Sequence, residues 1–313
     1  MLFKQWTAYL MMAAAMVTVG STIVASQMMG EIPVFVAAFL RFSIAGAVLI
    51  ALARLAGKRL PRLPRREWRV LGVQALVGSV GYSVLLMAGL AWTAASDASV
   101  IAGTLPAVAA LASTLFLGER LGRCALAGIA LATLGVAMLG LAGGDTGAHG
   151  SARWAGNALV LAAVGCEAVF LLLNKSIKTE IDPLLVAAIM AVLSMMFCVV
   201  PALCQWWFTP GPVVTARAAS AALYYALVPT VIGFFLWYKG ASMVSGAEAS
   251  LLTAVYPVTG LFFSAALLGV AIETAHAGAI AVTVLGIVTG ALGSRTGWPV
   301  RDRVSAGDRQ PGS

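Results

Sequence analysis

Two ionisable side chains stand well inside long apolar stretches of this chain. Glu167 lies in the stretch 154–174 and Arg41 in the stretch 33–55. Placing such a side chain at the centre of a membrane costs roughly 2.5 to 3.5 kcal/mol on insertion scales, so these residues are functional candidates by default. Glu167 could bind the ammonium group of a substrate or carry a proton. The alternatives are a structural salt bridge, with Arg41 as one possible partner, and a protonated, hydrogen-bonded carboxyl group.

Two prolines stand at equivalent places in two other apolar stretches. Pro106 lies within 98–117 and Pro257 within 247–269. Proline removes a backbone donor and bends a helix, and in transporters such breaks free carbonyl groups that can face a cavity. We predict kinks that shape a cavity, with Thr104 and Tyr256 offering hydroxyl groups to a substrate. The alternative is a pair of purely structural kinks.

Further side chains could contact a flat or polar substrate. Tyr82 stands in the middle of an apolar stretch, and Trp237 stands near the end of another, as a membrane anchor or an inner gate. Aromatic rings stack well on a flat apolar group, although ordinary helix packing explains them too. Ser21 and Thr22 form a small polar patch in the first stretch, for substrate contact or for hydrogen bonds between helices.

Residue combinations for enzymatic chemistry are missing from the sequence. There is no nucleotide-binding loop, no HExxH, no GxSxG and no Asp-rich metal motif, and the two histidines, His149 and His276, stand far apart. The cysteines form no CxxC pair. They are Cys124, Cys166, Cys198 and Cys204. The sequence therefore predicts a protein that is not an enzyme and has neither a metal nor a cofactor.

The elements that carry these residues are predicted to be transmembrane helices. Of 313 residues, 61% are hydrophobic and only 10% are charged, with a mean hydropathy of +0.95. Apolar runs of about 20 residues indicate spanning helices, and their lack of alternation argues against a β-barrel. We predict an all-α integral membrane protein with ten spans at 6–26, 33–55, 68–92, 98–117, 122–142, 154–174, 183–207, 218–239, 247–269 and 274–294.

The second half of the chain repeats the first after a shift of about 151 positions. Gly89 aligns with Gly240, Pro106 with Pro257, and Gly135 with Gly286. Because each half holds an odd number of spans, the second copy must be inverted, an arrangement typical of secondary transporters. The predicted division is a first repeat at 1–142, a linker at 143–153, a second repeat at 154–294 and a disordered cytoplasmic tail at 295–313.

The basic residues gather in short connections and in the C-terminal tail, most densely at 54–69. Cytoplasmic loops carry such an excess. Both termini are therefore predicted to be cytoplasmic, in a bacterial-type inner membrane. The net charge of +8 then reflects orientation rather than nucleic-acid binding. Glu119 lies beside Arg120 and Arg123 at the inner end of a span, and we assign it a structural or gating contact.

Several motifs resemble the EamA branch of the drug/metabolite transporter superfamily. They are Leu40-Arg-Phe-Ser-Ile-Ala45, Asp97-Ala-Ser-Val-Ile-Ala-Gly-Thr-Leu-Pro106, Leu117-Gly-Glu-Arg120 and, in the second copy, Glu248-Ala-Ser-Leu-Leu-Thr-Ala-Val-Tyr-Pro257. The resemblance covers about residues 6–294. It departs at Gly269-Val-Ala-Ile-Glu273, where the family often has a second Gly-Glu.

The resemblance carries expectations about architecture and substrate. It implies a central cavity lined by spans 1, 3, 4, 6, 8 and 9, with spans 5 and 10 outside. The chain looks most like the YddG-type exporters of aromatic and other neutral amino acids. Since the family has an arginine at the place of Arg41 across diverse substrates, the resemblance implies a structural or gating role for this residue.

Repeat and resemblance together predict a secondary transporter or facilitator. It would export small amphipathic metabolites, neutral or aromatic amino acids, by alternating access at a cavity between the repeats. One alternative is an efflux pump for cationic drugs or metabolites; another, of a different class, is a non-transporting membrane partner subunit. The expected partners are a small-molecule substrate and the lipid bilayer. The glycine-rich spans 122–142 and 274–294 are expected to pack against each other. The expected oligomeric state is a monomer or a weak homodimer through the same surface.

Overall fold

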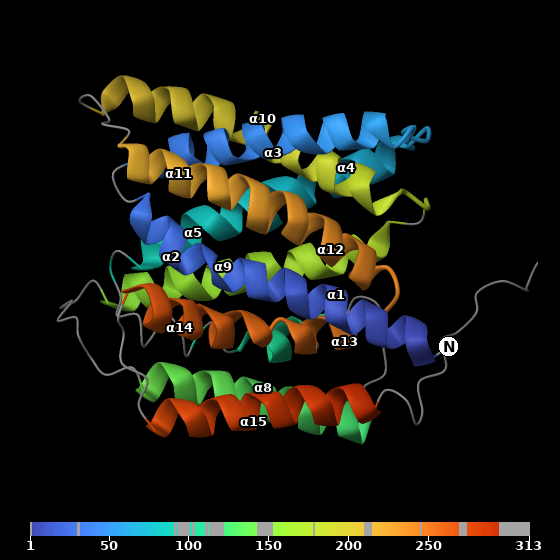
Figure 1. Ribbon diagram of the computed structural model, residues 1–313, viewed down its shortest axis with the longest axis vertical. Helices are drawn as coiled ribbons and strands as arrows, with labels where there is room; N and C mark the ends of the chain where they lie inside the picture. Colours follow the sequence, from blue (N-terminus) through green and yellow to red (C-terminus); the bar gives the residue numbers. More distant parts are fainter. Residues whose placement is uncertain are drawn as a thin grey trace, which may run out of the picture.

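The computed structural model describes residues 2–29, 32–90, 92, 101, 104–109, 112, 122–142, 153–177, 179–209, 215–244, 246–268 and 274–293. Within these residues every regular element is a helix (Figure 1). The elements of the first half are α1 (Leu2–Gly20), α2 (Thr22–Met28), α3 (Val34–Leu55), α4 (Arg65–Val73), η1 (Gln74–Gly81), α5 (Tyr82–Leu90) and α8 (Arg123–Ala142).

The second half continues the helical architecture. Its elements are α9 (Arg153–Ser176), α10 (Pro183–Phe208), α11 (Ala216–Tyr225), η2 (Ala226–Ile232), α12 (Gly233–Ala241), α13 (Gly246–Leu252), α14 (Val255–Leu268) and α15 (Thr274–Gly293). Local signals fix several ends. Asp182 caps α10 by accepting the Leu184 N–H at 3.0 Å, ahead of a proline at the first helical position. The left-handed Gly57 (φ 65°) ends α3.

Five helical stretches in the described part of the chain are long and apolar enough to cross a membrane. They are Val34–Leu55, Arg65–Leu86, Trp154–Asn174, Pro183–Phe208 and Ala216–Ala241. Shorter apolar helices are Arg123–Gly135, Val255–Leu267 and Thr274–Thr289. In the predicted span 98–117, residues 105–109 are helical. Glu119, the tail 295–313 and all of the predicted linker except Arg153, which begins α9, lie outside the described residues.

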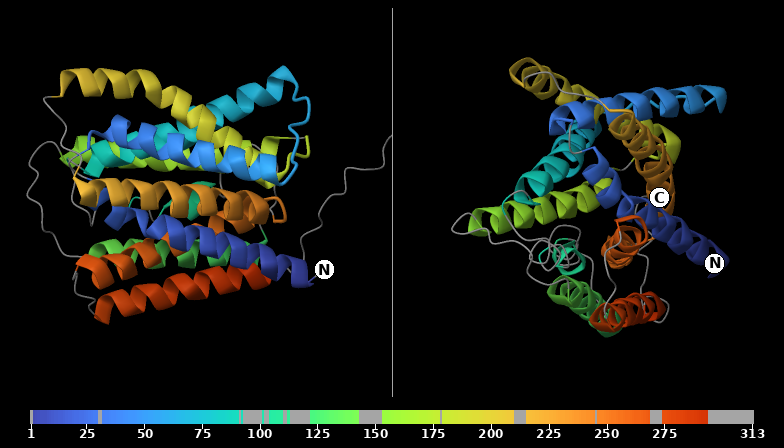
Figure 2. Two further views of the ribbon diagram at one scale, coloured as in Figure 1. Left: turned by 45° about the horizontal axis from the view of Figure 1, so that its top comes forward. Right: turned by 60° about the vertical axis from the view of Figure 1, so that its left-hand side comes forward.

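Helices from the two halves pair across the molecule. The pair α3 and α10 lies at one end and the pair α8 and α15 at the other, with α1, α5, α9, α12 and α14 between them (Figures 1 and 2). The glycines of α8 and α15 explain their close approach. A Cβ on Gly135 would lie 2.3 Å from Thr283 Oγ1, and one on Gly286 would lie 2.4 Å from the Ala132 nitrogen. The expected packing of these two helices against each other is confirmed.

Two spans contain a wider, π-helical segment at equivalent places in the two halves. The segment η1 joins α4 to α5, and η2 joins α11 to α12. In η2, Pro229 has no N–H to donate to the Tyr225 carbonyl, and the wider π-helical turn pairs this carbonyl with Thr230, whose hydroxyl also donates to it at 2.9 Å. Such segments occur frequently at functional sites.

The ninth span is interrupted just before Pro257. Helix α13 ends at Leu252 and α14 begins at Val255, with a turn at Thr253 and Ala254 between them. Since proline lacks an N–H, it cannot donate to the carbonyl four residues earlier, which is that of Thr253. The helix is thus interrupted at these two residues, and the Thr253 carbonyl accepts from the Tyr256 N–H at 3.1 Å instead.

Candidate functional site

A central cavity lies between the helices of the two halves. Its volume is about 120 Å³. Its wall comes from α1, α2, α3, η1, α5, α9, α11, η2, α12 and α14, the turn before α14 and residue 105 of the fourth span. Within the described residues α8 and α15 contribute no lining side chain, as expected, but α3 of the second span does through Arg41, which the expected set of lining spans did not include. The polar, charged and aromatic lining residues are Thr22, Arg41, Ser79, Tyr82, Ser83, Glu167, Phe170, Tyr225, Thr230, Phe234, Trp237, Thr253 and Tyr256.

A smaller pocket of about 20 Å³ adjoins this cavity and shares part of its wall. Both kink prolines, Pro106 and Pro257, line it together with Val164 and Ala254. Glu167, Tyr82 and Tyr256 belong to both spaces. Pro106 and Pro257 therefore lie beside the same small space as Glu167.

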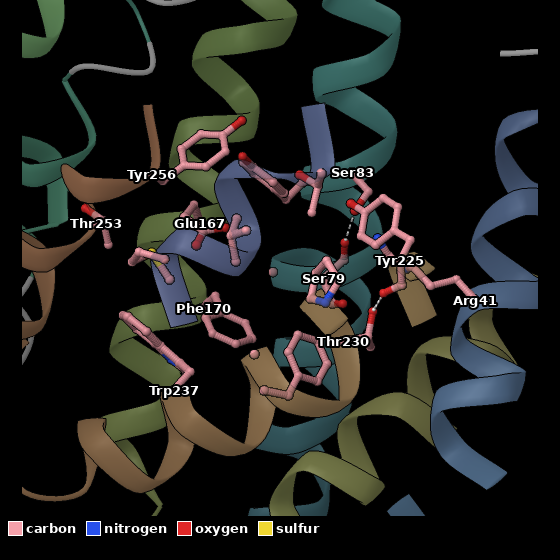
Figure 3. A pocket seen from close by; sticks show the side chains of 18 of the residues that line it. Arg41, Ser79, Ser83, Glu167, Phe170, Tyr225, Thr230, Trp237, Thr253 and Tyr256 are labelled. Atoms are coloured by element: carbon pink, nitrogen blue, oxygen red, sulfur yellow. Dashed lines mark hydrogen bonds between the residues drawn. The ribbon is translucent and has the colours of Figure 1, made fainter. Parts of the chain in front are cut away.

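Glu167 projects from α9 into the cavity, and Arg41 enters it from α3 on the other side (Figure 3). Both side chains are described, and no ion pair joins them. Within the described residues the ion pair found is Lys58 with Asp182, at 2.6 Å and away from the cavity. The salt bridge between Glu167 and Arg41 that the sequence left open is thus not formed.

Arg41 is held by aromatic rings. Its side chain is 8% exposed, and its guanidinium carbon lies 4.1 Å from the ring centre of Phe42 and 4.4 Å from that of Tyr225. Stacking of this kind stabilises a desolvated cation. Its buried Nε has no hydrogen-bond partner. The wall therefore carries a positive charge at one side and a carboxyl group at the other.

Aromatic side chains supply much of the remaining surface. Tyr82, Tyr256 and Trp237 line the cavity, and the buried Trp237 Nε1 has no hydrogen-bond partner. Behind the wall, Tyr238 packs against Phe170 and Phe234 with both ring-centre distances at 6.1 Å. The cavity can thus accept a flat apolar group on several sides.

Two hydroxyl groups considered as ligands are engaged locally. Ser21 accepts from the Tyr224 hydroxyl at 2.8 Å and donates to the Thr18 carbonyl at 2.6 Å. Thr104 donates to the Ile101 carbonyl at 2.6 Å. Neither residue lines the cavity, whereas Thr22 does.

Several lining residues were missed by sequence reasoning. Phe170 stands three residues after Glu167, and therefore on the same helical face, which was an available signal. Ser79 and Thr230 stand in the π-helical segments, whose wider turn left no sequence pattern that we recognised. Tyr225 is recognisable as part of the site only once its stacking on Arg41 is known.

Comparison with known proteins places the chain in a family. The model of the EamA-like transporter family matches residues 5–141 and again residues 154–289. The chain belongs to the EamA-like transporter family. It is thus a membrane transporter of the drug/metabolite transporter superfamily, and the predicted family is confirmed.

Relatives of this EamA-like transporter are themselves named as transporters. An uncharacterized transporter, YetK, of Bacillus subtilis (strain 168) is 34% identical over 91% of this chain and 86% of its own. The aromatic amino acid exporter YddG of Ancylobacter novellus is 29% identical over 84% of this chain and 88% of its own. A solved crystal structure has the same fold, with a TM-score of 0.77, 24% identity, and coverage of 91% of this chain and 98% of its own.

Proposed function

We propose that this transporter exports neutral and aromatic amino acids through the central cavity. The observation that carries the proposal is the combination of aromatic walls with the carboxyl group of Glu167 in one enclosed space. An aromatic amino acid presents a flat apolar side chain and an ammonium group, which these surfaces complement. The similarity to an aromatic amino acid exporter supports the same substrate class.

The proposed organisation is ten spans in two inverted repeats, 1–142 and 154–294, with both termini in the cytoplasm of a cell with a bacterial-type inner membrane. The double match of one family model and the paired helices of the two halves support it. Alternating access then follows from rocking of one repeat against the other around the cavity.

Contacts at the proposed cytoplasmic end would have to open in such a cycle. The Lys58–Asp182 ion pair joins the connection after α3 to the start of α10. Nearby, the Thr179 N–H donates to Glu67 Oε1 at 3.0 Å. Because each contact links one half of the chain to the other, both would have to break for this end to open.

Uptake into proteoliposomes tests the proposal. A labelled panel of neutral, aromatic, acidic and basic amino acids is offered to the reconstituted full chain, with and without a pH gradient. We expect saturable flux of aromatic and neutral members, and the response to the gradient measures proton coupling. Folded protein with no flux for any member would overturn the proposal.

Efflux of cationic compounds is the second candidate, since among the described residues no cationic side chain pairs with Glu167. Unlike amino-acid export, this activity has no use for Arg41, because a cationic substrate gains nothing from a guanidinium in the same cavity. Growth protection separates the two candidates. Protection against toxic aromatic amino-acid analogues supports amino-acid export, and protection against cationic dyes alone supports drug efflux.

A further inference from the structure

We propose that Arg41 binds the carboxylate of the substrate, opposite Glu167, so that the cavity selects zwitterions in one orientation. This inference rests on the proposed function and names the chemical groups that its substrate must carry. It assigns to Arg41 a ligand-binding role in place of the structural or gating role that the family resemblance implies.

The guanidinium of Arg41 is buried without a counter-charge in the described part of the chain. Arg41 is more than nine-tenths buried and lines the cavity, yet within the described chain it meets no acidic group and its Nε has no acceptor. Leaving a buried charge without a counter-charge is strongly unfavourable. A structural arginine would be expected to hold a carboxylate or several carbonyl groups. Here the donors are left for a ligand.

Aromatic rings stack against the guanidinium of Arg41. Phe42 and Tyr225 lie close to the guanidinium carbon, so the rings fix the plane of the group without using its N–H donors. A guanidinium held in this way presents a rigid fork, which matches the two oxygens of a carboxylate. Tyr225 also lines the cavity, so the fork stands at its wall rather than behind it.

The two charged side chains, Arg41 and Glu167, face each other across the cavity. Figure 3 places Arg41 and Glu167 on opposite sides of the cavity, with Ser79 and Ser83 near the path between them. Each charge occurs once: the position that corresponds to Glu167 in the other half is Met16, and the one that corresponds to Arg41 is Val192. A zwitterion therefore meets complementary charges in only one orientation, and its side chain faces the aromatic wall.

Three ligands separate the two charge contacts. L-phenylalanine has both groups, L-phenylalaninamide has only the ammonium, and 3-phenylpropionate has only the carboxylate. Their dissociation constants are measured by calorimetry with the full chain in lipid nanodiscs. The wild-type chain is expected to bind L-phenylalanine at least about tenfold more tightly than either of the others.

Substitutions should shift these preferences in opposite directions. Arg41→Gln should weaken binding of L-phenylalanine and 3-phenylpropionate at least about tenfold and leave binding of L-phenylalaninamide within about twofold. Glu167→Gln should weaken L-phenylalanine and L-phenylalaninamide and spare 3-phenylpropionate. Lys239→Gln is the control, since Lys239 also lies over an aromatic ring, Phe235, but outside the cavity.

Other outcomes overturn specific parts of the account. If Arg41→Gln weakens all three ligands alike, its role is structural. If it changes none, Arg41 does not touch the substrate. Should this variant fail to fold, Arg41→Lys is measured in its place, because it keeps the charge without the fork. If Arg41→Lys prefers L-phenylalanine over L-phenylalaninamide as strongly as the wild type does, the proposal is contradicted. If the wild-type chain binds L-phenylalanine no better than the amide, the zwitterion site is wrong while amino-acid export stands. If it binds none of the three, the proposed function fails as well.

Discussion

The α8–α15 seam and the central cavity use the two halves of the chain in opposite ways. At the seam, Gly135 packs on Thr283, and its counterpart Gly286 packs on Ala132, the counterpart of Thr283. In the cavity the same positions line the wall from both halves, but their chemistry differs. The pairs that differ are Met16 with Glu167, Val19 with Phe170, Gly78 with Pro229, Tyr82 with Gly233, Ser83 with Phe234 and Leu105 with Tyr256, whereas Ser79 and Thr230 keep a hydroxyl group in both halves.

This comparison separates positions that support the fold from positions that bind the substrate. Close helix packing makes the same demand on each copy, because a small residue must stand wherever backbones approach. A substrate with distinct ends makes different demands on each copy. Equal residues should therefore tolerate change equally, and unequal residues should not.

The largest expected effect separates Glu167 from its counterpart. Glu167→Gln should reduce flux of labelled L-phenylalanine into proteoliposomes by at least about tenfold, because the ammonium group loses its charged partner. Met16→Leu conserves apolar volume at the equivalent position and should change flux by less than about twofold. Normal flux through the Glu167→Gln variant across a range of pH would contradict both the binding and the coupling role.

At the seam the two copies should respond alike. Gly135→Ala and Gly286→Ala each place a methyl group into backbone of the facing helix and should lower stability by about 1–3 kcal/mol. Thermal unfolding in detergent measures this as a lower midpoint. Gly278→Ala is the control, since a Cβ there meets nothing within 4 Å. A midpoint that falls for one seam glycine alone would break the symmetry argument.

The π-helical segments should respond unequally. Thr230→Val removes the hydroxyl that satisfies the Tyr225 carbonyl and should lower stability by roughly 0.5–1.5 kcal/mol. Ser79 is its counterpart, but there the bond runs from the Ser83 hydroxyl to the Ser79 carbonyl at 2.8 Å. Ser79→Ala keeps that bond and should lower the unfolding midpoint less. Equal losses would contradict a specific stabilising role for the Thr230 hydroxyl.

The smallest expected effect lies at the proposed cytoplasmic end. A hydrogen bond from Lys58 holds the pKa of Asp182 below its ordinary value of 3.8, and the Leu184 N–H contributes while partial burial opposes. At pH values above the ordinary pKa of 3.8 the ion pair therefore stabilises the protein. This stabilisation is lost as the pH falls through the lowered pKa of Asp182. Because Lys58 is 45% exposed, solvent screening limits the effect to less than about 1 kcal/mol.

Two substitutions at Asp182 separate the ion pair from the helix cap. Asp182→Asn removes the charge but keeps a capping side chain, so its unfolding midpoint should fall slightly at neutral pH and converge with the wild type in acid. Asp182→Ala also loses the cap on Leu184 and should stay below the wild type at every pH. A difference between Asp182→Asn and the wild type that persists at low pH would show that the charge is not the cause.

Much of the architecture could be predicted from the sequence because the bilayer imposes simple rules. Apolar run length predicts helices such as α3 and α10, and repeated glycines predict the packing of α8 on α15. The break before Pro257 follows from the missing proline N–H. These are local or periodic properties, and each can be recognised without knowledge of the neighbouring helices.

The parts of the site that escaped prediction depend on contacts between distant residues. The sequence places Arg41 in a span but does not show that Tyr225 stacks on it with its donors left free. Likewise, the sequence offers the hydroxyl groups of Ser21 and Thr104 as substrate ligands. In the folded chain both hydroxyl groups donate to nearby backbone carbonyls. The sequence names candidate polar residues for a cavity, but only the folded chain shows which of their groups bond to the backbone and which face the cavity.

A structure of the full chain with saturating L-phenylalanine tests the central claim most directly. The account predicts the amino acid inside the central cavity, with its carboxylate at Arg41, its ammonium at Glu167 and its ring against the aromatic wall. An amino acid bound elsewhere on the molecule, or bound in the cavity with these two groups reversed, would contradict it.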